Sequence, residues 1–306
     1  MSGATTQWID RPDADTAQGI TALLARATAA DGVAPVSEQA VLSLTSGADT
    51  GARHLLARRD GALAGYANLV PAHGGHPAMA EVAVDPAQRG HGVGTELVTA
   101  ALAAGGPGAR VWAHGDRPAA KAVAAHLGLR TARELWQMRR SLATPELPEL
   151  AVPDGIALRT YAGRADDAEL LRVNGAAFAW HPEQGGWTAR DLEVRRNESW
   201  FDPAGLFLAF DTAVPDRLLG FHWTKVHPGE DPPLGEVYVV GIDPAAQGRG
   251  LGRLLTLAGL RYLRDRGSTE VLLYTEADNA AAVRTYTRLG FAPAHVDVAY
   301  AAAESE

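Results

Sequence analysis

Apolar residues in the second half of the chain follow two different periods in turn. Short runs with strand-like spacing alternate with longer runs whose apolar positions recur every three or four residues, as on one face of a helix. The turn residues VPD at 214–216 separate two of the strand-like runs and predict a hairpin. The expected strands are 206–211, 218–227, 236–243 and 269–276, and the expected helices are 166–178, 253–267 and 280–290, the last two ending at Gly267 and Gly290.

The first half of the chain shows the same order of patterns. The triplet Asp-Pro-Ala occurs at 85–87 and again at 243–245, and the Leu-Gly pair at 127–128 matches the pair at 289–290. An internal duplication explains these matches most simply. The corresponding segments of the first half are a hairpin at 54–70, strands at 79–86 and 109–115, and helices at 95–106 and 119–129.

The two halves are separated by a segment that has no apolar periodicity. Residues 141–155, SLATPELPELAVPDG, contain three prolines near the midpoint of a 306-residue chain, which is long enough for two domain cores. We expect an α/β (α+β) protein with a first domain at 1–142, a linker at 143–154 and a second domain at 155–306.

Composition excludes several classes of function. A net charge of −8 argues against a general nucleic-acid or anionic-membrane binder, and the absence of cysteine excludes disulfides and thiolate metal ligands. No apolar run approaches the roughly 18 residues that span a bilayer, and the amino-terminal residues lack the pattern of a secretion signal. We expect a soluble, cytoplasmic monomer that acts on a small molecule, and no feature of the sequence calls for a metal ion.

The stretch QGRGLG at 247–252 lies between a predicted strand and a predicted helix. A chain that leaves a strand, turns through glycines and enters a helix presents unpaired backbone N–H groups at the positive end of the helix dipole, which is a binding site for anions. The glycines allow a bulky diphosphate to approach the main chain, and Arg249 and Arg253 add positive charge beside it. We therefore expect a pyrophosphate group at this loop.

The spacing of the glycines narrows the kind of ligand. It fits neither the dinucleotide pattern GxGxxG nor the P-loop GxxxxGK[ST]. It fits Q/R-x-x-G-x-G/A, once from Gln247 to Gly252 and once from Arg89 to Gly94, each time after a strand and an Asp-Pro turn. A single match could serve only to turn the chain, but two matches in the same context favour a binding function.

These motifs resemble those of the GNAT-type N-acetyltransferases. Residues 279–291 also reproduce that family's N-x-x-A-x-x-x-Y-x-x-x-G-F. The resemblance implies two tandem acyl-CoA N-acyltransferase domains, each a mixed, splayed β-sheet flanked by helices. It also implies acetyl-CoA as cosubstrate, held where the parallel strands 236–242 and 270–276 separate, with its pyrophosphate on the glycine loop.

The resemblance implies coenzyme contacts in both domains. In the first domain the third position of the loop is His91, where the second domain has Arg249, and this difference weakens phosphate binding at neutral pH. We expect the first domain to bind acetyl-CoA without transferring its acetyl group. The implied contacts are Val82, Ala83, Val84, Gly90, His91, Gly92, Val93, Gly94 and Thr95 in the first domain and Val240, Gly241, Ile242, Gln247, Gly248, Arg249, Gly250, Leu251, Gly252, Arg253, Asn279, Ala280, Ala281, Ala282, Val283 and Arg284 in the second.

Acetyl transfer to an amine needs a base for the amine and an acid for the departing thiolate. We assign these roles to Glu236, at the start of a strand, and Tyr286, although a solvent-facing strand residue and a core tyrosine are the plain alternatives. Counting from the glycine loop and from the Leu-Gly pair places Ala78 and Ala124 at these positions in the first domain. Neither transfers a proton, so the second domain is the expected catalyst, with Glu81 as a shifted alternative base in the first.

The chain resembles one group of this family in its tandem arrangement and in the sequence motifs HPEQG, GFHWTKVH and LLYTEADNAAAVRTYTRLGF. Its members acetylate the cysteinyl α-amine of 1D-myo-inositol 2-(L-cysteinylamino)-2-deoxy-α-D-glucopyranoside, a cysteinyl-glucosaminyl-inositol. Two alternatives stay open, namely transfer to another amine, such as an aminoglycoside or a protein N-terminus, and a non-catalytic acyl-CoA sensor. The acceptor contacts implied by the resemblance are Glu38, Glu183, Lys225, Glu236 and Tyr274.

Overall fold

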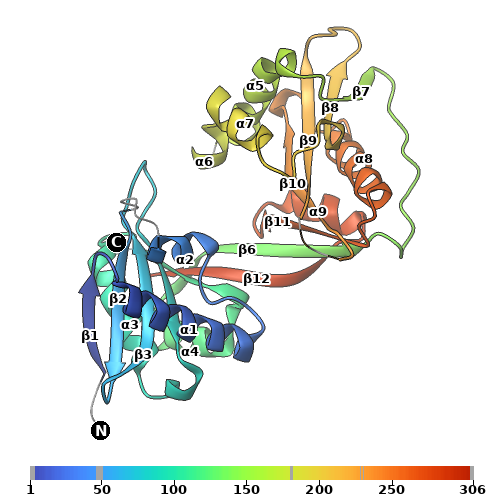
Figure 1. The fold of residues 1–306 in the computed structure, drawn as a ribbon. Helices are drawn as coiled ribbons and strands as arrows, with labels where there is room; N and C mark the ends of the chain where they lie inside the picture. The colour runs from blue at the N-terminus through green and yellow to red at the C-terminus, as the bar shows by residue number, and fades with distance from the viewer. Residues whose placement is uncertain (1–3, 46–50, 180–181, 228, 230, 304–306) are drawn as a thin grey trace. The chain divides into compact units, whose positions relative to one another are not determined.

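The computed structural model describes residues 4–45, 51–179, 182–227, 229 and 231–303. It forms two compact units, unit 1 with Met1–Leu135 and Val296–Glu306, and unit 2 with Trp136–His295 (Figure 1). None of the helices within these described ranges combines the length and the apolar character that a membrane crossing requires.

Unit 1 contains a mixed sheet whose strand order is β1-β2-β3-β4-β5-β12. All neighbouring strands are antiparallel except β4 and β5, which are parallel. The strands are β1 (Thr5–Ile9), β2 (Arg53–Arg59), β3 (Ala62–Val70), β4 (Met79–Val84), β5 (Arg110–Ala113) and β12 (Ala292–Ala301). The helices are α1 (Ala14–Asp31), α2 (Glu38–Thr45), η1 (Pro86–Gln88), α3 (Val93–Gly105), η2 (His114–Asp116) and α4 (Pro118–His126).

Helices α1 and α3 cover opposite faces of the unit 1 sheet (Figure 1). The Asp13 side chain caps α1 by accepting from the Thr16 N–H, and the left-handed Gly32 ends the helix. The apolar stripe of α1 packs with Leu56, whereas α3 packs with Leu55 on the other face, because neighbouring strand residues point to opposite sides. The sheet is thus buried on both faces.

Unit 2 repeats this plan with the strand order β6-β11-β10-β9-β8-β7. Here β10 and β11 are the parallel pair, and α5 and α8 pack against opposite faces. The strands are β6 (Arg130–Ser141), β7 (Ile156–Thr160), β8 (Leu206–Asp211), β9 (Leu218–Val226), β10 (Leu234–Ile242) and β11 (Glu270–Glu276). The helices are η3 (Arg164–Asp166), α5 (Asp167–Ala177), α6 (Pro182–Gly185), α7 (Ala189–Arg196), η4 (Pro203–Gly205), η5 (Pro244–Ala246), α8 (Leu251–Asp265) and α9 (Ala280–Arg288).

The parallel strands separate in both units, as the predicted splayed sheet requires. Pairing between β4 and β5 ends at Glu81 and Trp112, yet β4 continues to Val84. Pairing between β10 and β11 ends at Val237 and Leu273, yet β10 continues to Ile242. Beyond these points, the backbone N–H and C=O groups on one edge of β4 and of β10 are no longer paired with β5 and β11. The predicted fold class is confirmed.

The two units differ from the domains expected from the sequence. The predicted linker at 143–154 lies in unit 2, where Leu147 is buried in one cluster with Leu257 and Leu273. The end of the chain, predicted to close the second domain, instead pairs residues 298–301 with β5 of unit 1. Local patterns show that a segment is extended, but they do not show which sheet it joins.

Candidate active site

The glycine loop of unit 2 is built as an open anion site. Gly248 and Gly250 have φ angles of 80° and 75°, which L residues rarely adopt, and α8 begins directly after Gly250. Within the described residues, no side chain caps this helix start, and a Cβ atom at Gly248, Gly250 or Gly252 would meet nothing within 4 Å. The first amides of α8 are therefore available to an anion, and neighbouring side chains leave the turn open.

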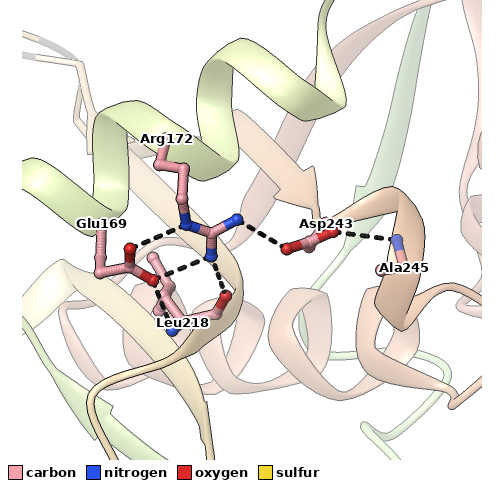
Figure 2. Close-up of polar contacts among 5 residues, drawn as sticks. All are labelled: Glu169, Arg172, Leu218, Asp243 and Ala245. Atoms are coloured by element: carbon pink, nitrogen blue, oxygen red, sulfur yellow. Dashed lines mark hydrogen bonds and ion pairs between the residues drawn. The ribbon is translucent and has the colours of Figure 1, made fainter.

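An arginine cluster around the buried Asp243 holds the strand end that leads into this loop (Figure 2). The Asp243 carboxylate accepts from Arg172 Nη1 at 2.8 Å and from the Ala245 N–H at 2.9 Å. Arg172 also donates to Glu169 and to the Leu218 carbonyl, each at 2.8 Å. Burial alone would raise the pKa of Asp243, but these hydrogen bonds outweigh it and lower the pKa, so the carboxylate stays charged and the corner stays fixed.

Unit 1 holds its glycine loop in the same way. The Asp85 carboxylate accepts from Arg26 of α1 at 2.9 and 2.6 Å and from the Ala87 N–H at 3.0 Å. Gly90 and Gly92 adopt left-handed φ angles of 77° and 85° before α3 begins. The Asp-Pro-Ala and glycine motifs that are repeated in the sequence thus form the same hydrogen-bonded turn in both units.

A cavity of about 570 Å³ lies beside the unit 1 loop. It brings together the predicted coenzyme contacts of this domain with the exception of His91, which is exposed and does not line the cavity. Arg89 lines it too, but this guanidinium donates to both carboxylate oxygens of Asp31, at 2.9 and 2.8 Å. The predicted residues along the cavity wall are Val82, Ala83, Val84, Gly90, Gly92, Val93, Gly94 and Thr95.

The predicted coenzyme residues of unit 2 gather around the start of α8 and α9. Residues 240–242 end β10, residues 247–253 form the loop and the first turn of α8, and residues 279–284 begin α9, which Asn279 caps by accepting from the Ala282 N–H. Arg249 differs from the expectation, because its guanidinium turns toward Asp211, at 3.5 Å. Arg253 is exposed in the first turn of α8.

Glu236 lies on β10 next to the point where β10 and β11 separate. It pairs with Lys225 of β9 on one side and with Leu272 of β11 on the other. The residue is only 8% exposed, unlike an ordinary surface residue of a strand, and its Oε2 lies 2.8 Å from His227 Nε2. A buried carboxylate with a single histidine at hydrogen-bond distance is suited to exchanging a proton.

Aromatic rings position Lys225 on the same face of the sheet. Its Nζ lies 5.3 Å from the ring centre of Trp200 and 5.8 Å from that of Tyr238. The two rings meet edge to face at 5.0 Å. Cation–π attraction therefore holds the ammonium group against these rings, and Lys225 is the pairing partner of Glu236 across the strands.

Tyr286 lies on α9, half-buried, with its ring edge against Phe291 at 5.8 Å. Burial raises the pKa of its hydroxyl to about 12, so the side chain keeps its proton at neutral pH. The corresponding helix of unit 1, α4, carries the buried Ala124 at the position that the sequence assigned. A proton donor is thus present on this helix in unit 2 and absent from the same position in unit 1.

The other predicted acceptor contacts are distributed over both units. Tyr274 lies two residues beyond Leu272 on β11, therefore on the face of Glu236, and its hydroxyl accepts from Gln137 Nε2 at 2.8 Å. Glu183 belongs to α6, and its side chain lies outside the described part of the structure. Glu38 is exposed in the first turn of α2 in unit 1.

His227 and Trp200 are two residues of this site that the sequence analysis missed. Trp223, Lys225 and His227 alternate along β9 and its end, so all three face the side of Glu236. The alternation in the word GFHWTKVH was the signal that pointed to it. Trp200, which was also missed, reaches the site from the segment after α7, and its sequence surroundings carry no comparable signal.

The carboxylate of unit 1 has different surroundings. Glu81 accepts from the backbone N–H and the hydroxyl of Ser37, both at 2.9 Å, and lies 2.7 Å from His114 Nε2. The other ring nitrogen of His114 lies 3.3 Å from Asp297. Burial alone would lower the pKa of His114, but hydrogen bonds to Asp297 and Glu81 raise it to about 9, so the imidazole is charged and held between two carboxylates.

Relatives with full-length similarity carry a common name. The chain is 79% identical to a mycothiol acetyltransferase of Nocardia farcinica over 302 residues, which is 99% of both chains. It is 63% identical to a mycothiol acetyltransferase of Rhodococcus opacus over 305 residues, 99% of this chain and 100% of that one.

Two solved structures and a family model are also similar to this chain. A GCN5-related N-acetyltransferase from Sphaerobacter thermophilus is 26% identical, with a TM-score of 0.69 over 96% of this chain and 94% of that one. A tandem GNAT protein from the clavulanic acid biosynthesis pathway, 21% identical, shares the fold with a TM-score of 0.66 over 99% and 100% of the two chains. The model of the acetyltransferase (GNAT) family matches residues 24–129 and 175–291. With one match in each half and the duplicated glycine loops, the chain belongs to the GNAT family of acetyltransferases.

Proposed function

We propose that this protein is a mycothiol acetyltransferase. It transfers the acetyl group of acetyl-CoA to the cysteinyl α-amine of 1D-myo-inositol 2-(L-cysteinylamino)-2-deoxy-α-D-glucopyranoside, giving mycothiol and CoA. Full-length relatives of that name at 79% and 63% identity support the choice of acceptor. The assignment of the reaction to unit 2 rests on Glu236. This residue is buried where β10 and β11 separate, on the strand that leads into an open glycine loop. We further propose that the enzyme is a cytoplasmic monomer.

In this proposal the coenzyme binds along the free edge of residues 240–242, with its diphosphate on the amides of Gly248 to Gly252. The loop is open and the first amides of α8 have no side-chain cap within the described residues, which suits a diphosphate. The Arg172 and Asp243 pair keeps this loop in place relative to the strand. This arrangement brings the thioester toward the carboxylate side of β10.

Glu236 then acts as the general base. It removes a proton from the α-ammonium group of the acceptor, and the neutral amine attacks the thioester carbonyl carbon. The C–S bond breaks as the tetrahedral intermediate collapses, and Tyr286 donates its proton to the departing thiolate. The second proton that the nitrogen loses on forming the amide restores the Tyr286 hydroxyl. A pKa of about 12 for Tyr286 keeps this proton in place until the thiolate forms.

Acceptor recognition in this proposal depends on charge and hydrogen bonding. Lys225, held by Trp200 and Tyr238, donates to hydroxyl oxygens of the sugar or inositol. Tyr274, which is 49% exposed, offers its hydroxyl on the same face. Glu38 and Glu183 stay predictions from the family resemblance alone.

Unit 1 is proposed to bind acetyl-CoA without transferring the acetyl group. Its cavity brings together the backbone positions expected for the coenzyme, which supports binding. Glu81 is occupied by three hydrogen-bond partners, and Ala124 stands where unit 2 has a tyrosine, which argues against proton transfer there.

The test is an acetylation assay of the purified protein with acetyl-CoA and a panel of amines. The panel contains the cysteinyl-glucosaminyl-inositol, an aminoglycoside and a peptide with a free N-terminus. We expect kcat/KM to be highest for the cysteinyl compound. Equal or higher kcat/KM for another amine would overturn the acceptor, and binding of acetyl-CoA without turnover of any amine would identify a sensor.

A further inference from the structure

Glu236 must discard a proton in every turnover of the proposed reaction. The acceptor enters as an ammonium ion with three N–H bonds and leaves as an amide with one. One of the two lost protons ends on the thiol of CoA, and the other must reach solvent. Because Glu236 is 8% exposed, its carboxyl group needs a partner that carries this proton outward.

His227 has the geometry of such a partner. Its Nε2 lies 2.8 Å from Glu236 Oε2, and its side chain is 29% exposed whereas that of Glu236 is 11% exposed. Its own backbone N–H donates to the Leu234 carbonyl at 2.9 Å, which fixes the residue directly after β9. The imidazole therefore joins the buried carboxylate to solvent.

We infer that His227 is the proton exit of the active site. This inference rests on the proposed role of Glu236 as base. Glu236 takes a proton from the α-ammonium group, passes it to His227 Nε2, and the imidazolium releases a proton from Nδ1 to water. Glu236 is then again a carboxylate and His227 a neutral imidazole with its proton on Nε2. Exchange of the ring protons with water restores the Nδ1–H tautomer before the next turnover, and no oxidant, reductant or metal enters the step. Imidazole exchanges protons readily near neutral pH, which suits it to this task.

The surroundings of His227 differ from those of the histidine in unit 1. Lys225 lies two residues earlier on the same face of β9, and Glu236, the pairing partner of Lys225, lies opposite on β10. Unit 1 differs here, because His114 lies between Glu81 and Asp297 at 2.7 and 3.3 Å and is only 17% exposed. A histidine that is held by two carboxylates retains its proton.

The contact between His227 and Glu236 would look the same if His227 only oriented the carboxylate and carried no proton. His227→Gln separates these roles, because the glutamine amide can donate to Glu236 but cannot relay a proton. His227→Ala removes both functions and opens space for free imidazole. We expect kcat of both variants to fall about 10-fold or more, the low end of general acid–base effects, with KM for acetyl-CoA within about twofold of the wild type.

Added imidazole at constant pH and ionic strength is the decisive measurement. We expect imidazole to raise kcat of His227→Ala several-fold. It should also raise kcat of His227→Gln, because it acts as a mobile buffer. It should have no effect on the wild type or on the control variant His126→Gln, which replaces an exposed histidine of α4 in unit 1. Should His227→Ala fail to fold, as judged by circular dichroism, the response of His227→Gln decides.

Two outcomes would overturn the inference. One is a kcat of His227→Gln equal to that of the wild type, and the other is a reduced kcat that imidazole leaves unchanged. Failure of the proposed function is recognised separately with Glu236→Gln. If Glu236→Gln is inactive and the His227 variants are fully active, the proton exit alone is wrong. If Glu236→Gln keeps full activity, the assignment of the base is wrong.

Discussion

Units 1 and 2 place a carboxylate and a histidine together in two different ways. In unit 1, Glu81 is held by the backbone N–H and the hydroxyl of Ser37 and by His114, which is itself fixed by Asp297. In unit 2, Glu236 lies against His227, which reaches solvent. Both carboxylates are buried, at 7% and 8% exposure, so burial does not distinguish them. The difference shows that two carboxylates at equivalent depth in the fold can have unlike partners, and in our proposal only the one whose partner can release a proton serves as a base.

The glycine loops, in contrast, are nearly the same in both units. Each follows an aspartate that is held by a helix arginine, Arg26 to Asp85 and Arg172 to Asp243. The charges beside the loops differ, because Arg89 of unit 1 is neutralised by Asp31 whereas unit 2 has Gln247 at that position. The duplicated scaffold therefore provides an open glycine loop in both units, whereas individual side chains beside the loops differ.

The largest expected effect is on the base itself. Glu236→Gln removes the proton acceptor and is expected to lower kcat by about 100-fold or more, within the range of general-base catalysis. Its counterpart Glu81→Gln changes the buried cluster of unit 1 and should lower Tm while leaving kcat per folded molecule within about twofold. Steady-state kinetics and thermal unfolding of both variants provide the measurement. A larger loss of kcat in Glu81→Gln would reverse the assignment of the two units.

The next effect concerns the proton donor that only α9 carries. Tyr286→Phe preserves the ring packing against Phe291 but removes the hydroxyl, and we expect kcat to fall by about 10- to 100-fold with little change in KM. The remaining activity should improve with thioesters whose thiols are more acidic, because such a leaving group needs less protonation. Equal losses for acidic and basic leaving groups would contradict the donor role.

A smaller effect is expected for coenzyme binding in unit 1. Asp31→Ala frees Arg89 and should strengthen CoA binding there by about two- to fivefold, as removal of a partly exposed ion pair allows. Isothermal titration calorimetry with CoA measures it, at low salt to limit screening. The matched control is Asp211→Ala, which releases the longer 3.5 Å contact of Arg249 in unit 2 and should change affinity less. No gain in Asp31→Ala would show that Arg89 does not meet the diphosphate.

The smallest effect is a pH dependence of stability from His114. Its folded-state pKa of about 9 lies above the ordinary 6.5, so the folded state favours the charged form. This contribution is fully present below about pH 6.5 and is lost as the pH rises through about 9. His114→Gln should therefore lower Tm by a few degrees at pH 6, where about 1 kcal/mol corresponds to about 2–4 °C, and the deficit should shrink toward pH 9.5. A deficit that grows with pH would contradict the charged cluster.

The sequence alone determined the parts of this protein that depend on short-range physics. Glycine spacing between a strand and a helix predicts an anion loop because positive φ angles and free amides are local properties, and Gly248 and Gly250 confirmed the turn. The repeated words predicted two similar domains, and residues 279–291 identified the GNAT family. The role of Glu236 as base was predicted from its place on the strand before the loop and stays a prediction.

Tertiary structure decided what lies far apart in the chain. The C-terminal strand pairs with β5 of unit 1, and Asp297 on it holds His114, 183 positions earlier in the sequence. Trp200 approaches Lys225 although its sequence surroundings give no sign of this contact. Strand pairing and side-chain neighbours are set by burial and hydrogen bonding over the whole unit, and a local pattern contains neither. For that reason the sequence pointed to the carboxylates, whereas only the fold showed that Glu81 has three hydrogen-bond partners and that Glu236 lies against a partly exposed histidine.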